Sequence, residues 1–487
     1  MAFRIAVLGG GFSGLIGAWL VEATASDAAD VVIFEASERL GGRVQTRAFS
    51  DTDILYDAGA AELYDIHGSP RLRQLVRRLS LSNTPMTATP FFVDEGEVLR
   101  DSSDFRRYLG AAGFETLSAF WERGLALRSP QDYASAGHPT DGGHPWADKP
   151  FREALARIGS EKAQRFTEFQ VHSDVATEPD RTSALYGFDN LLIDHPGYCS
   201  MYTLDGGNER LIEALAERVS ADVRLGSRAL SVEPLRDGAF ELVYSADAAL
   251  ERETFDAVLC TLPAPEVPHL HWDDPELAQR VAGHVERHYF PTDYVRVSAL
   301  FDEPLWREQF CEDYFVASAF DGVTVYDKTP REGSPDYGIL SWLIGGAEAS
   351  RAATSADDAL LAEAIESLPQ AFDGAERGIR AHEVDRWTGG RGVSRLPGGS
   401  PIGAYEQRHT PDPRLPGLVF SGDYLYDATL CGALDSALYS ARHLLDRAGM
   451  PLSQEQVWSA AVAPGSDAED VAASLSVAEL CFLRSLD

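Results

Sequence analysis

One stretch near the start of this chain of 487 residues indicates its fold. It covers residues 3–14 and has the sequence Phe3-Arg4-Ile5-Ala6-Val7-Leu8-Gly9-Gly10-Gly11-Phe12-Ser13-Gly14. Its first half, residues 3–8, is almost continuously apolar, which is typical of a strand buried on both faces of a parallel sheet. Residues 12–25 have a helical composition and follow a glycine-rich turn. The order strand, turn, helix predicts the first unit of a Rossmann-type α/β domain.

Three glycines in the turn have the spacing GxGxxG, at Gly9, Gly11 and Gly14. The first permits a tight turn, the second lets the backbone approach a pyrophosphate, and the third lets the helix pack closely on the strand. A pyrophosphate would meet the unpaired N–H groups of Phe12 and Ser13, where the helix dipole is positive. The turn therefore predicts a dinucleotide-binding site.

A second expected strand, residues 31–34, ends at Glu35, which lies 21 residues after Gly14. This carboxylate is placed to accept hydrogen bonds from the ribose hydroxyls of an adenosine, beside Ala36. An acid here would also repel a 2′-phosphate, so NADP is disfavoured. These residues alone leave both NAD and FAD open.

The segment that follows carries a family resemblance. Residues 35–46, with the sequence EASERLGGRVQT, resemble the segment after the ribose acid in the flavin amine oxidase superfamily. The resemblance implies FAD, with Gly42 and Arg43 along its pyrophosphate. Residues 57–60, Asp-Ala-Gly-Ala, resemble the family's acid-x-Gly element, which implies that Gly59 and Ala60 lie beside the isoalloxazine ring.

Two later segments extend the resemblance. After a glycine turn at residues 204–210, the family uses a strand backbone to hydrogen-bond the adenine, and the matching position here is nearest Ala229. Residues 417–423 end in Gly422 and Asp423, and the resemblance implies that this acid lies at the ribityl and phosphate region. A helix that opens at residue 432 would place Ala433 and Leu434 near the pyrimidine ring of the flavin.

The resemblance implies an α/β fold in which a Rossmann-type FAD-binding domain is interleaved with an α+β substrate-binding domain. Helical periodicity in residues 101–128 and 151–170 predicts a helical insert. We expect the FAD-binding domain at 1–85, 200–285 and 386–450, the substrate-binding domain at 86–199 and 286–385, and a C-terminal extension at 451–487 that could supply a homodimer contact or a packed tail.

Arg296 is the first of two departures from the family pattern. Residues 295–306 resemble the strand and Pro-x-Trp turn that carry a water-bridged lysine near flavin N5 in many amine oxidases, and Arg296 stands at the lysine position. Arginine stays protonated at any working pH, so it cannot act as a base there. It could hold water, bind an acidic group, or pair with an acid such as Asp293.

The second departure concerns the pocket walls. Gly392 and Ala433 stand where monoamine oxidases have two tyrosines, so Trp387 is either the one aromatic wall or a core residue. Arg391 stands where those enzymes attach flavin to a cysteine, which implies noncovalent FAD. Glu62 stands where L-amino-acid oxidases place a carboxylate-binding arginine, and an acid there favours a cationic amine.

Composition excludes several function classes. A formal net charge of −34 repels phosphate backbones and anionic lipids, which argues against nucleic-acid and membrane partners. Five cysteines without a CxxC pair fit a reduced, cytoplasmic protein, and no metal-ligand spacing is present.

Our leading hypothesis is therefore an FAD-dependent, amine oxidase-like enzyme. It would transfer hydride from a C–N bond, or an adjacent C–H bond, of a small metabolite to the flavin, with O2 as the reoxidant. Arg296, Glu62 and Trp387 are the candidate catalytic residues. The alternatives are a flavin-dependent desaturase or isomerase acting on a C–C bond, and a catalytically inactive flavoprotein scaffold.

Overall fold

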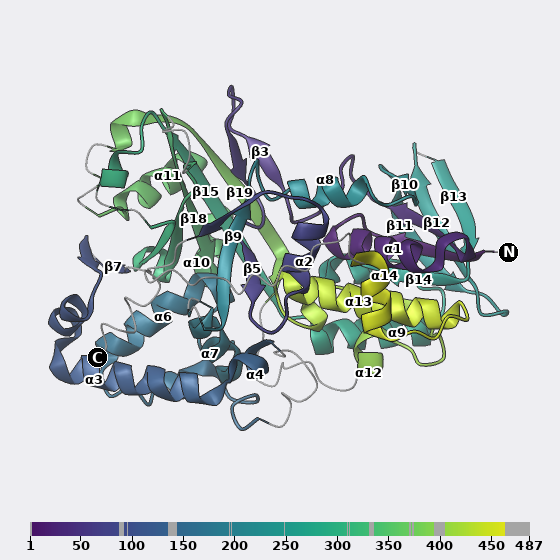
Figure 1. The fold of residues 1–487 in the computed structure, drawn as a ribbon, viewed down its shortest axis with the longest axis horizontal. Coiled ribbons are helices and arrows are strands. Elements are labelled where there is room, and N and C mark those ends of the chain that lie inside the picture. The colour runs from purple at the N-terminus through teal and green to yellow at the C-terminus, as the bar shows by residue number, and fades with distance from the viewer. Residues whose placement is uncertain are drawn as a thin grey trace.

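The chain forms two lobes, each built around one main sheet (Figure 1). The computed structural model describes residues 2–86, 92–94, 96–134, 144–193, 195, 197–247, 249–308, 310, 312–330, 336–369, 372, 375–393 and 405–462. We call the lobes the parallel-sheet lobe and the mixed-sheet lobe, after the sheets at their centres.

The centre of the parallel-sheet lobe is a five-stranded sheet in the order β10-β2-β1-β14-β20, with all neighbours parallel. Its strands are β1 (Phe3–Leu8), β2 (Ala29–Phe34), β10 (Asp222–Arg224), β14 (Ala257–Cys260) and β20 (Leu418–Phe420). β1 lies where the apolar run predicted it, β2 follows soon after α1, and the other three strands come from distant parts of the chain.

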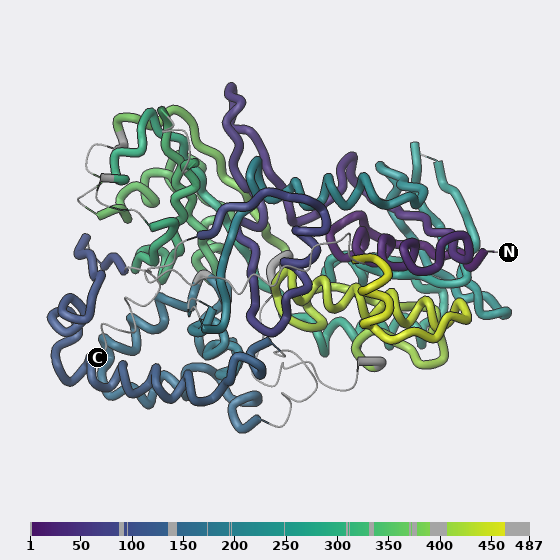
Figure 2. Tube along the Cα trace, viewed as in Figure 1, coloured from purple at the N-terminus to yellow at the C-terminus, as the bar shows by residue number. Residues whose placement is uncertain are grey.

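Different layers cover the two faces of this sheet because side chains along each strand alternate between them. Ile5 and Val7 pack with α1 (Phe12–Ala25), α13 (Leu430–Arg447) and α14 (Gln454–Val462). Ala6 and Leu8 pack against an antiparallel sheet of β11 (Arg228–Pro234), β12 (Phe240–Ala246) and β13 (Ala249–Phe255). Figure 2 shows the purple N-terminal and yellow C-terminal segments side by side in this lobe, where α1 contacts both α13 and α14.

The mixed-sheet lobe is centred on seven strands in the order β19-β15-β18-β17-β16-β7-β8. Val295, Val297 and Ala299 point from β15 toward a core shared with α10 and α11. Arg296 therefore lies on the opposite face of β15, the face on which Leu300 packs with Tyr56 and Ala58. The elements are β7 (Phe92–Asp94), β8 (Glu97–Leu99), β15 (Pro291–Phe301), β16 (Tyr314–Ala317), β17 (Val323–Asp327), β18 (Gly338–Gly345), β19 (Ile379–Val393), α10 (Gly346–Ala352) and α11 (Asp357–Glu366).

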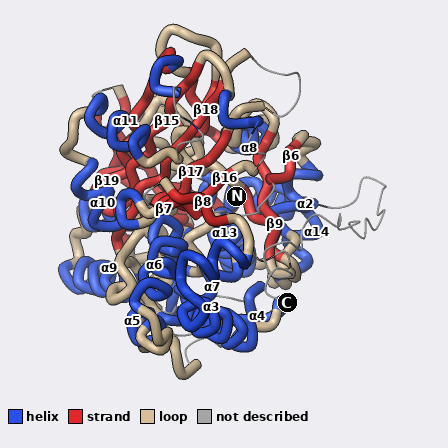
Figure 3. The backbone as a smooth tube through the Cα atoms, turned by 90° about the vertical axis from the view of Figure 1, so that its left-hand side faces the viewer, coloured by secondary structure: helices blue, strands red, loops and turns tan. Residues whose placement is uncertain are grey.

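The predicted helical insert forms an outer layer of this lobe. α3 (Ser102–Leu127) is broken at Gly110, whose φ is 73°. The stretch 151–170 contains two helices, α5 (Phe151–Leu155) and α6 (Glu161–Val175), instead of one. α7 (Ala184–Leu192) joins them in one aromatic-rich core. Figure 3 shows α3, α5, α6 and α7 gathered below the strands.

Small elements connect the lobes. β5 (Leu63–Ile66), β9 (Cys199–Leu204) and β6 (Asn83–Met86) form a three-stranded sheet, and β3 (Thr46–Ala48) pairs with β4 (Leu55–Asp57). The remaining helices are α2 (Arg71–Arg78), α4 (Pro130–Ala134), α8 (Arg210–Ala216), α9 (Pro275–His288) and α12 (Tyr405–His409).

Several sequence-based boundaries differ from the structure. β13 was not anticipated, because its exposed, charged residues lack the apolar character used to find strands. α9 runs through the expected domain boundary at 285/286, and β19 runs through the one at 385/386. In the extension, Trp458 Nε1 donates to Gln74 Oε1 (2.9 Å), so α14 packs on its own chain. The rest of the expected extension, residues 463–487, lies outside the described residues.

Candidate functional site

The glycine turn between β1 and α1 is shaped by close backbone contacts. Gly9 has a φ of 107°, and a Cβ on Gly14 would lie 2.1 Å from the carbonyl oxygen of Gly9. A Cβ on Gly11 would meet no described atom within 4 Å. Gly11 is also the N-cap of α1 and supplies no side-chain hydrogen bond. The positive end of α1 therefore faces open space, which is what an anion cradle requires.

The first two residues of α1 offer this space different groups. The Phe12 side chain is buried in the core between the parallel sheet and α13, so Phe12 can contribute only its backbone N–H at the helix end. Ser13 follows it in the same uncapped turn. Both predicted positions are thus compatible with binding through backbone N–H groups.

Glu35 lies at the end of β2 and faces the same turn. Its Oε2 accepts a hydrogen bond from the Gly10 N–H (2.8 Å), and its Oε1 accepts one from the Ser37 hydroxyl (2.7 Å). The backbone of Ser227 donates to the carbonyl of Glu35 (2.8 Å), which brings Ala229 on β11 close to Glu35 and Ala36. The predicted ribose and adenine positions therefore lie together.

Arg43 and Asp423, which are 380 residues apart, form a bidentate ion pair with both N–O distances at 2.8 Å. Gly42 has a φ of 57°, and a Cβ on it would lie 3.5 Å from the Cα of Gly11. The Gly422 N–H donates to the Ser436 hydroxyl on α13 (3.0 Å). The predicted pyrophosphate arginine and the C-terminal acid thus meet beside the glycine turn.

The segment 57–62 has a tightly fixed backbone. A Cβ on Gly59 would lie 2.0 Å from the carbonyl oxygen of Arg43, and the Ala60 N–H donates to that same oxygen (3.2 Å). Trp387 Nε1 on β19 donates to the carbonyl of Ala58 (2.7 Å). Trp387 therefore ties the mixed sheet to this segment, a role that aromatic character alone did not predict.

The start of α13 differs slightly from expectation. The helix begins at Leu430, with Thr429 as N-cap, rather than at Gly432. Ala433 and Leu434 lie in its first turns and are 6% and 1% exposed. The Leu434 side chain packs in the core, so this residue could approach a cofactor only through its backbone.

A group of polar side chains lies next to this segment, and we call it the polar cluster. Asp57, Arg296 and Tyr326 are buried in it, and Glu62 and Lys328 are half-buried. Arg296 is 3% exposed, and its guanidinium carbon lies 5.5 Å from the centre of the Tyr326 ring. Among the described residues, its Nε and Nη1 have no hydrogen-bond partner.

Glu62 supplies the opposite charge. Its Oε1 accepts hydrogen bonds from the hydroxyls of Tyr64 (2.8 Å) and Tyr326 (3.3 Å). Its buried Oε2 finds no hydrogen-bond partner within the described part of the chain. An unpaired buried charge is unfavourable, so both Glu62 and Arg296 are suited to binding a charged ligand.

Lys328 was missed by the sequence analysis. It follows β17, and its Nζ donates to the carbonyl of Ala61 and lies 5.4 Å from the centre of the Tyr326 ring. Burial lowers the pKa of the Lys328 ammonium and Arg296 lowers it further, whereas the carboxylates of Asp57 and Glu62 oppose this shift. The sequence offered one signal that could have drawn attention to Lys328: lysine is rare in this chain, which has only three.

Asp57 anchors the other end of the cluster. Its Oδ1 accepts hydrogen bonds from the Thr46 hydroxyl (2.8 Å) and the Asn208 N–H (2.9 Å). Burial raises the pKa of Asp57 against the opposing charge of Lys328. Asn208 Nδ2 also donates to the carbonyl of Ala60 (2.9 Å), so the glycine turn at 204–210 supports the segment directly.

The structure also bears on metals and membranes. The described residues contain no group of three or more His, Cys, Asp or Glu side chains that could hold a metal ion. No helix in the described ranges is long and apolar enough to cross a bilayer. Cys199, Cys260 and Cys431 are buried free thiols.

The fold and this geometry define a class of protein, the dinucleotide-binding oxidoreductases. A family model described as flavin containing amine oxidoreductase matches residues 12–445. The chain belongs to this family, and it is a flavin-dependent oxidoreductase.

Similar proteins support the assignment. The flavin-dependent L-tryptophan oxidase RebO of Lentzea aerocolonigenes is 24% identical over 491 residues, which cover 90% of this chain and 97% of that protein. A triple mutant of putrescine oxidase has a TM-score of 0.74 at 18% identity and covers 92% of this chain and 99% of its own. Cyclohexylamine oxidase from Brevibacterium oxydans IH-35A has a TM-score of 0.70 at 18% identity, with 92% and 99% covered. These structures share the fold.

Proposed function

We propose that this chain binds FAD noncovalently and oxidises the amino group of a small molecule. Support for FAD comes from the open, uncapped start of α1 at Gly11, the carboxylate of Glu35 beside it, and the Arg43–Asp423 pair. These groups would hold the pyrophosphate and the adenosine ribose. Bound FAD would supply the hydride acceptor, with O2 as the reoxidant.

The polar cluster carries the proposal for the reaction. It adjoins Gly59 and Ala60, whose backbone the family places beside the isoalloxazine, and it presents unpaired groups of both signs. Glu62 Oε2 is suited to hold an ammonium or amine nitrogen and to orient the neighbouring carbon. Trp387, bonded to Ala58, would fix one wall of the same pocket.

The charges favour a substrate that bears both an amino group and a carboxylate. The unpaired Nε and Nη1 of Arg296 would bind a carboxylate. Glu62, which stands at the position of the carboxylate-binding arginine of L-amino-acid oxidases, cannot do so because it is itself an acid. Asp385, opposite Arg296 in the sheet register, is already bonded to Arg47 (2.8 Å) and so only partly neutralises Arg296. The L-tryptophan oxidase named above is a relative with such a substrate.

The test uses the purified protein as isolated. A flavin absorbance spectrum, with FAD released intact by heat or acid, would support noncovalent binding. Anaerobic mixing with L-tryptophan, putrescine and cyclohexylamine should then bleach the flavin with at least one of the three, and peroxide should form on aeration. Turnover of another compound without net oxidant would overturn the proposal in favour of an isomerase, and a flavin that none of the amines bleaches would contradict it.

We further propose a cytoplasmic location and a homodimer. Three buried thiols that form no disulfide fit a reducing compartment. Light scattering of the purified chain would decide the oligomeric state, and a mass of one chain would overturn the dimer. Fractionation of the source cells would test the location.

A further inference from the structure

Lys328 has a place in the molecule that differs from that of the other two lysines. Lys149 lies near Glu153 (3.9 Å) with its side chain 46% exposed, and Lys162 lies over the ring of Tyr108 (3.5 Å) on the outer helices. Lys328 instead enters the polar cluster and is held by the carbonyl of Ala61. A side chain with a strongly hydrated charge is unfavourable there unless it has a role.

Amine oxidation requires a group that removes a proton from the substrate ammonium, and a lysine amine can do this. Most small amines carry a proton at neutral pH, and an ammonium nitrogen has no lone pair with which to assist the departure of a hydride from the adjacent carbon. A group at the substrate nitrogen must therefore accept a proton before the C–H bond breaks. General bases of this kind contribute about 10²- to 10⁴-fold to rates.

The other charged groups of the cluster are poorly suited to this task. Arg296 stays protonated. Asp57 Oδ1 already accepts two hydrogen bonds, from Thr46 and Asn208. Glu62 accepts two tyrosine hydroxyls on Oε1, and a carboxylate is intrinsically a much weaker base than an amine.

The environment of Lys328 makes its ammonium easier to deprotonate than that of an exposed lysine. Partial burial and the nearby guanidinium of Arg296 both lower the pKa of Lys328, and Ala61 can accept one N–H while the nitrogen lone pair stays available. Opposing this are the carboxylates of Asp57, Glu62 and Asp313. After proton uptake, the same carboxylates would stabilise the lysine ammonium. The charged and titratable groups facing Lys328 are Asp57, Glu62, Arg296, Asp313 and Tyr326.

We propose that Nζ of Lys328 is the proton acceptor for the substrate ammonium, with Glu62 holding the nitrogen beside it. This inference rests on the proposed amine oxidation. In the step, one N–H bond of the substrate breaks and its electron pair stays on nitrogen, while a new N–H bond forms on Nζ. The hydride, with two electrons, would then pass from the adjacent carbon to bound flavin, and the lysine proton would be released to solvent.

The first test measures the protonation of Lys328 directly and does not use activity. With only three lysines in the chain, selective Nζ-¹⁵N or Cε-¹³C lysine labelling gives three side-chain NMR signals in the flavin-loaded protein. Lys328→Met assigns the signal of interest, or Lys149→Met and Lys162→Met assign it by elimination. We expect the Lys328 signal to titrate at lower pH than the other two. A Lys328 signal that titrates with them, or above them, overturns the proposal.

The second test follows the reductive half-reaction. Lys328→Met should slow anaerobic flavin bleaching about 100-fold at pH 7, with the difference shrinking as pH rises and free substrate loses its own proton. Lys328→Arg should not restore the rate, because a guanidinium cannot accept the proton. Lys149→Met is the matched control and should bleach like wild type. Restoration by arginine, or a loss that is independent of pH, overturns the proposal.

The two hypotheses fail in different ways. If none of the three amines bleaches the wild-type flavin, the proposed function fails, and the NMR titration still decides the state of Lys328. If wild type bleaches and Lys328→Met bleaches equally fast at every pH, only the assignment of Lys328 fails. If Lys328→Met does not retain flavin, the titration of the wild-type protein decides alone.

Discussion

The glycine turn and the polar cluster are assembled in opposite ways. The turn is contiguous in sequence, and a Cβ on Gly14 would lie 2.1 Å from the carbonyl oxygen of Gly9, which leaves no alternative to glycine there. The polar cluster draws its members from β4, the residue before β5, β15, and the end of β17 with the residue after it, which only the folded chain brings together. The steric constraints of the glycine turn appear as a sequence motif, whereas the side chains of the polar cluster are too far apart in sequence to form one.

The largest effect should come from Gly14→Ala. The added Cβ would lie 2.1 Å from the Gly9 carbonyl and 2.9 Å from Thr261 Oγ1, and neither can withdraw without opening the turn. We expect at least about 3 kcal/mol of destabilisation and little soluble protein. Urea unfolding followed by circular dichroism measures the effect. Gly283→Ala on α9, where a Cβ meets no described atom within 4 Å, is the control and should be neutral or slightly stabilising.

Arg296→Met should separate substrates by charge. Removing the guanidinium should raise the KM for L-tryptophan about 100-fold, or about 3 kcal/mol, because a carboxylate would lose a charged hydrogen bond in a buried site. The KM for cyclohexylamine, which has no carboxylate, should change less than about threefold. Equal effects on both amines would argue against a carboxylate at Arg296.

Gly11→Ala should leave the fold intact and weaken the cofactor. Its Cβ meets no described atom within 4 Å, and its φ of −76° suits any residue. The methyl group would occupy the space in front of α1, so we expect FAD affinity to fall about tenfold, or about 1.4 kcal/mol. Flavin content and fluorescence titration measure this. Unchanged FAD binding would contradict the location of the pyrophosphate.

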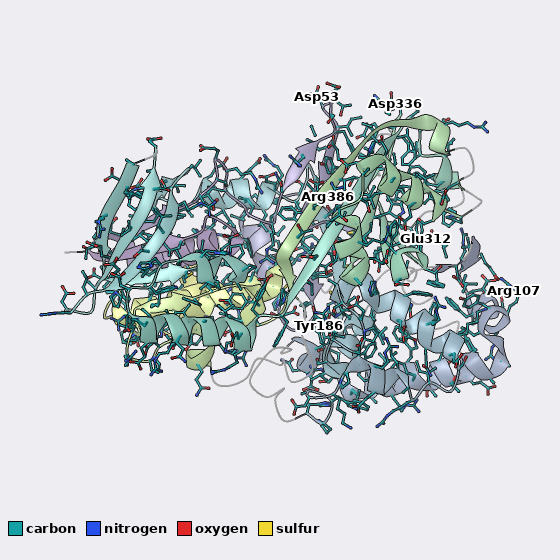
Figure 4. The ribbon with its side chains drawn as sticks, turned by 180° about the vertical axis from the view of Figure 1, so that it is seen from behind. Asp53, Arg107, Tyr186, Glu312, Asp336 and Arg386 are labelled. Atoms are coloured by element: carbon teal, nitrogen blue, oxygen red, sulfur yellow. The ribbon has the colours of Figure 1, made fainter. Side chains whose placement is uncertain are left out.

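Asp423→Asn should have a smaller effect on the same site. It removes the charge that orients Arg43, whose side chain is 41% exposed, so the pair contributes only about 1 kcal/mol. FAD retention on gel filtration should fall several-fold. The control is Asp104→Asn, which disturbs the exposed pair with Arg107 at the edge of the helical layer (Figure 4) and should change neither flavin content nor Tm.

The smallest effect should come from Trp387→Phe, which removes one hydrogen bond to Ala58. A loss of about 1 kcal/mol is expected, together with a shift in the flavin absorbance bands. Trp306→Phe is a matched control, since it removes the bond from Trp306 Nε1 to Asp327 (3.0 Å) and should lower Tm without moving those bands. Identical spectra for the two variants would mean that Trp387 lies away from the flavin.

The sequence allowed much of the fold to be predicted, for physical reasons that particular residues illustrate. Phe3–Leu8 and Phe12–Ala25 have the predicted bounds because apolar runs and glycine turns determine them locally. The family resemblance implied that Arg43 and Asp423 each lie along the cofactor, and the structure joins the two in an ion pair that the sequence had not predicted. Lys328 could not be found in this way, since nothing in Val323–Asp327 shows which residue will face Glu62.

Two of the expected domain boundaries fall inside continuous elements for a related reason. α9 and β19 are continuous elements, so no change in composition marks the points where the chain was divided at 285 and 385. The exposed strand β13 was missed because its pairing with β12, and not its own burial, holds it in place. Elements held by partners distant in sequence leave weak local signals.

β19 links remote positions to the pocket. On one side Trp387 holds Ala58, and on the other Arg386 holds the carbonyl of Ser355 (2.8 Å) and the carboxylate of Asp357 (2.6 Å) at the start of α11 (Figure 4). A shift of α11 would therefore be transmitted through Arg386 and Trp387, adjacent residues of one strand, to the backbone of Ala58. Directed evolution for new substrates should accordingly recover changes at the outer surface around Asp357 as well as in the pocket lining.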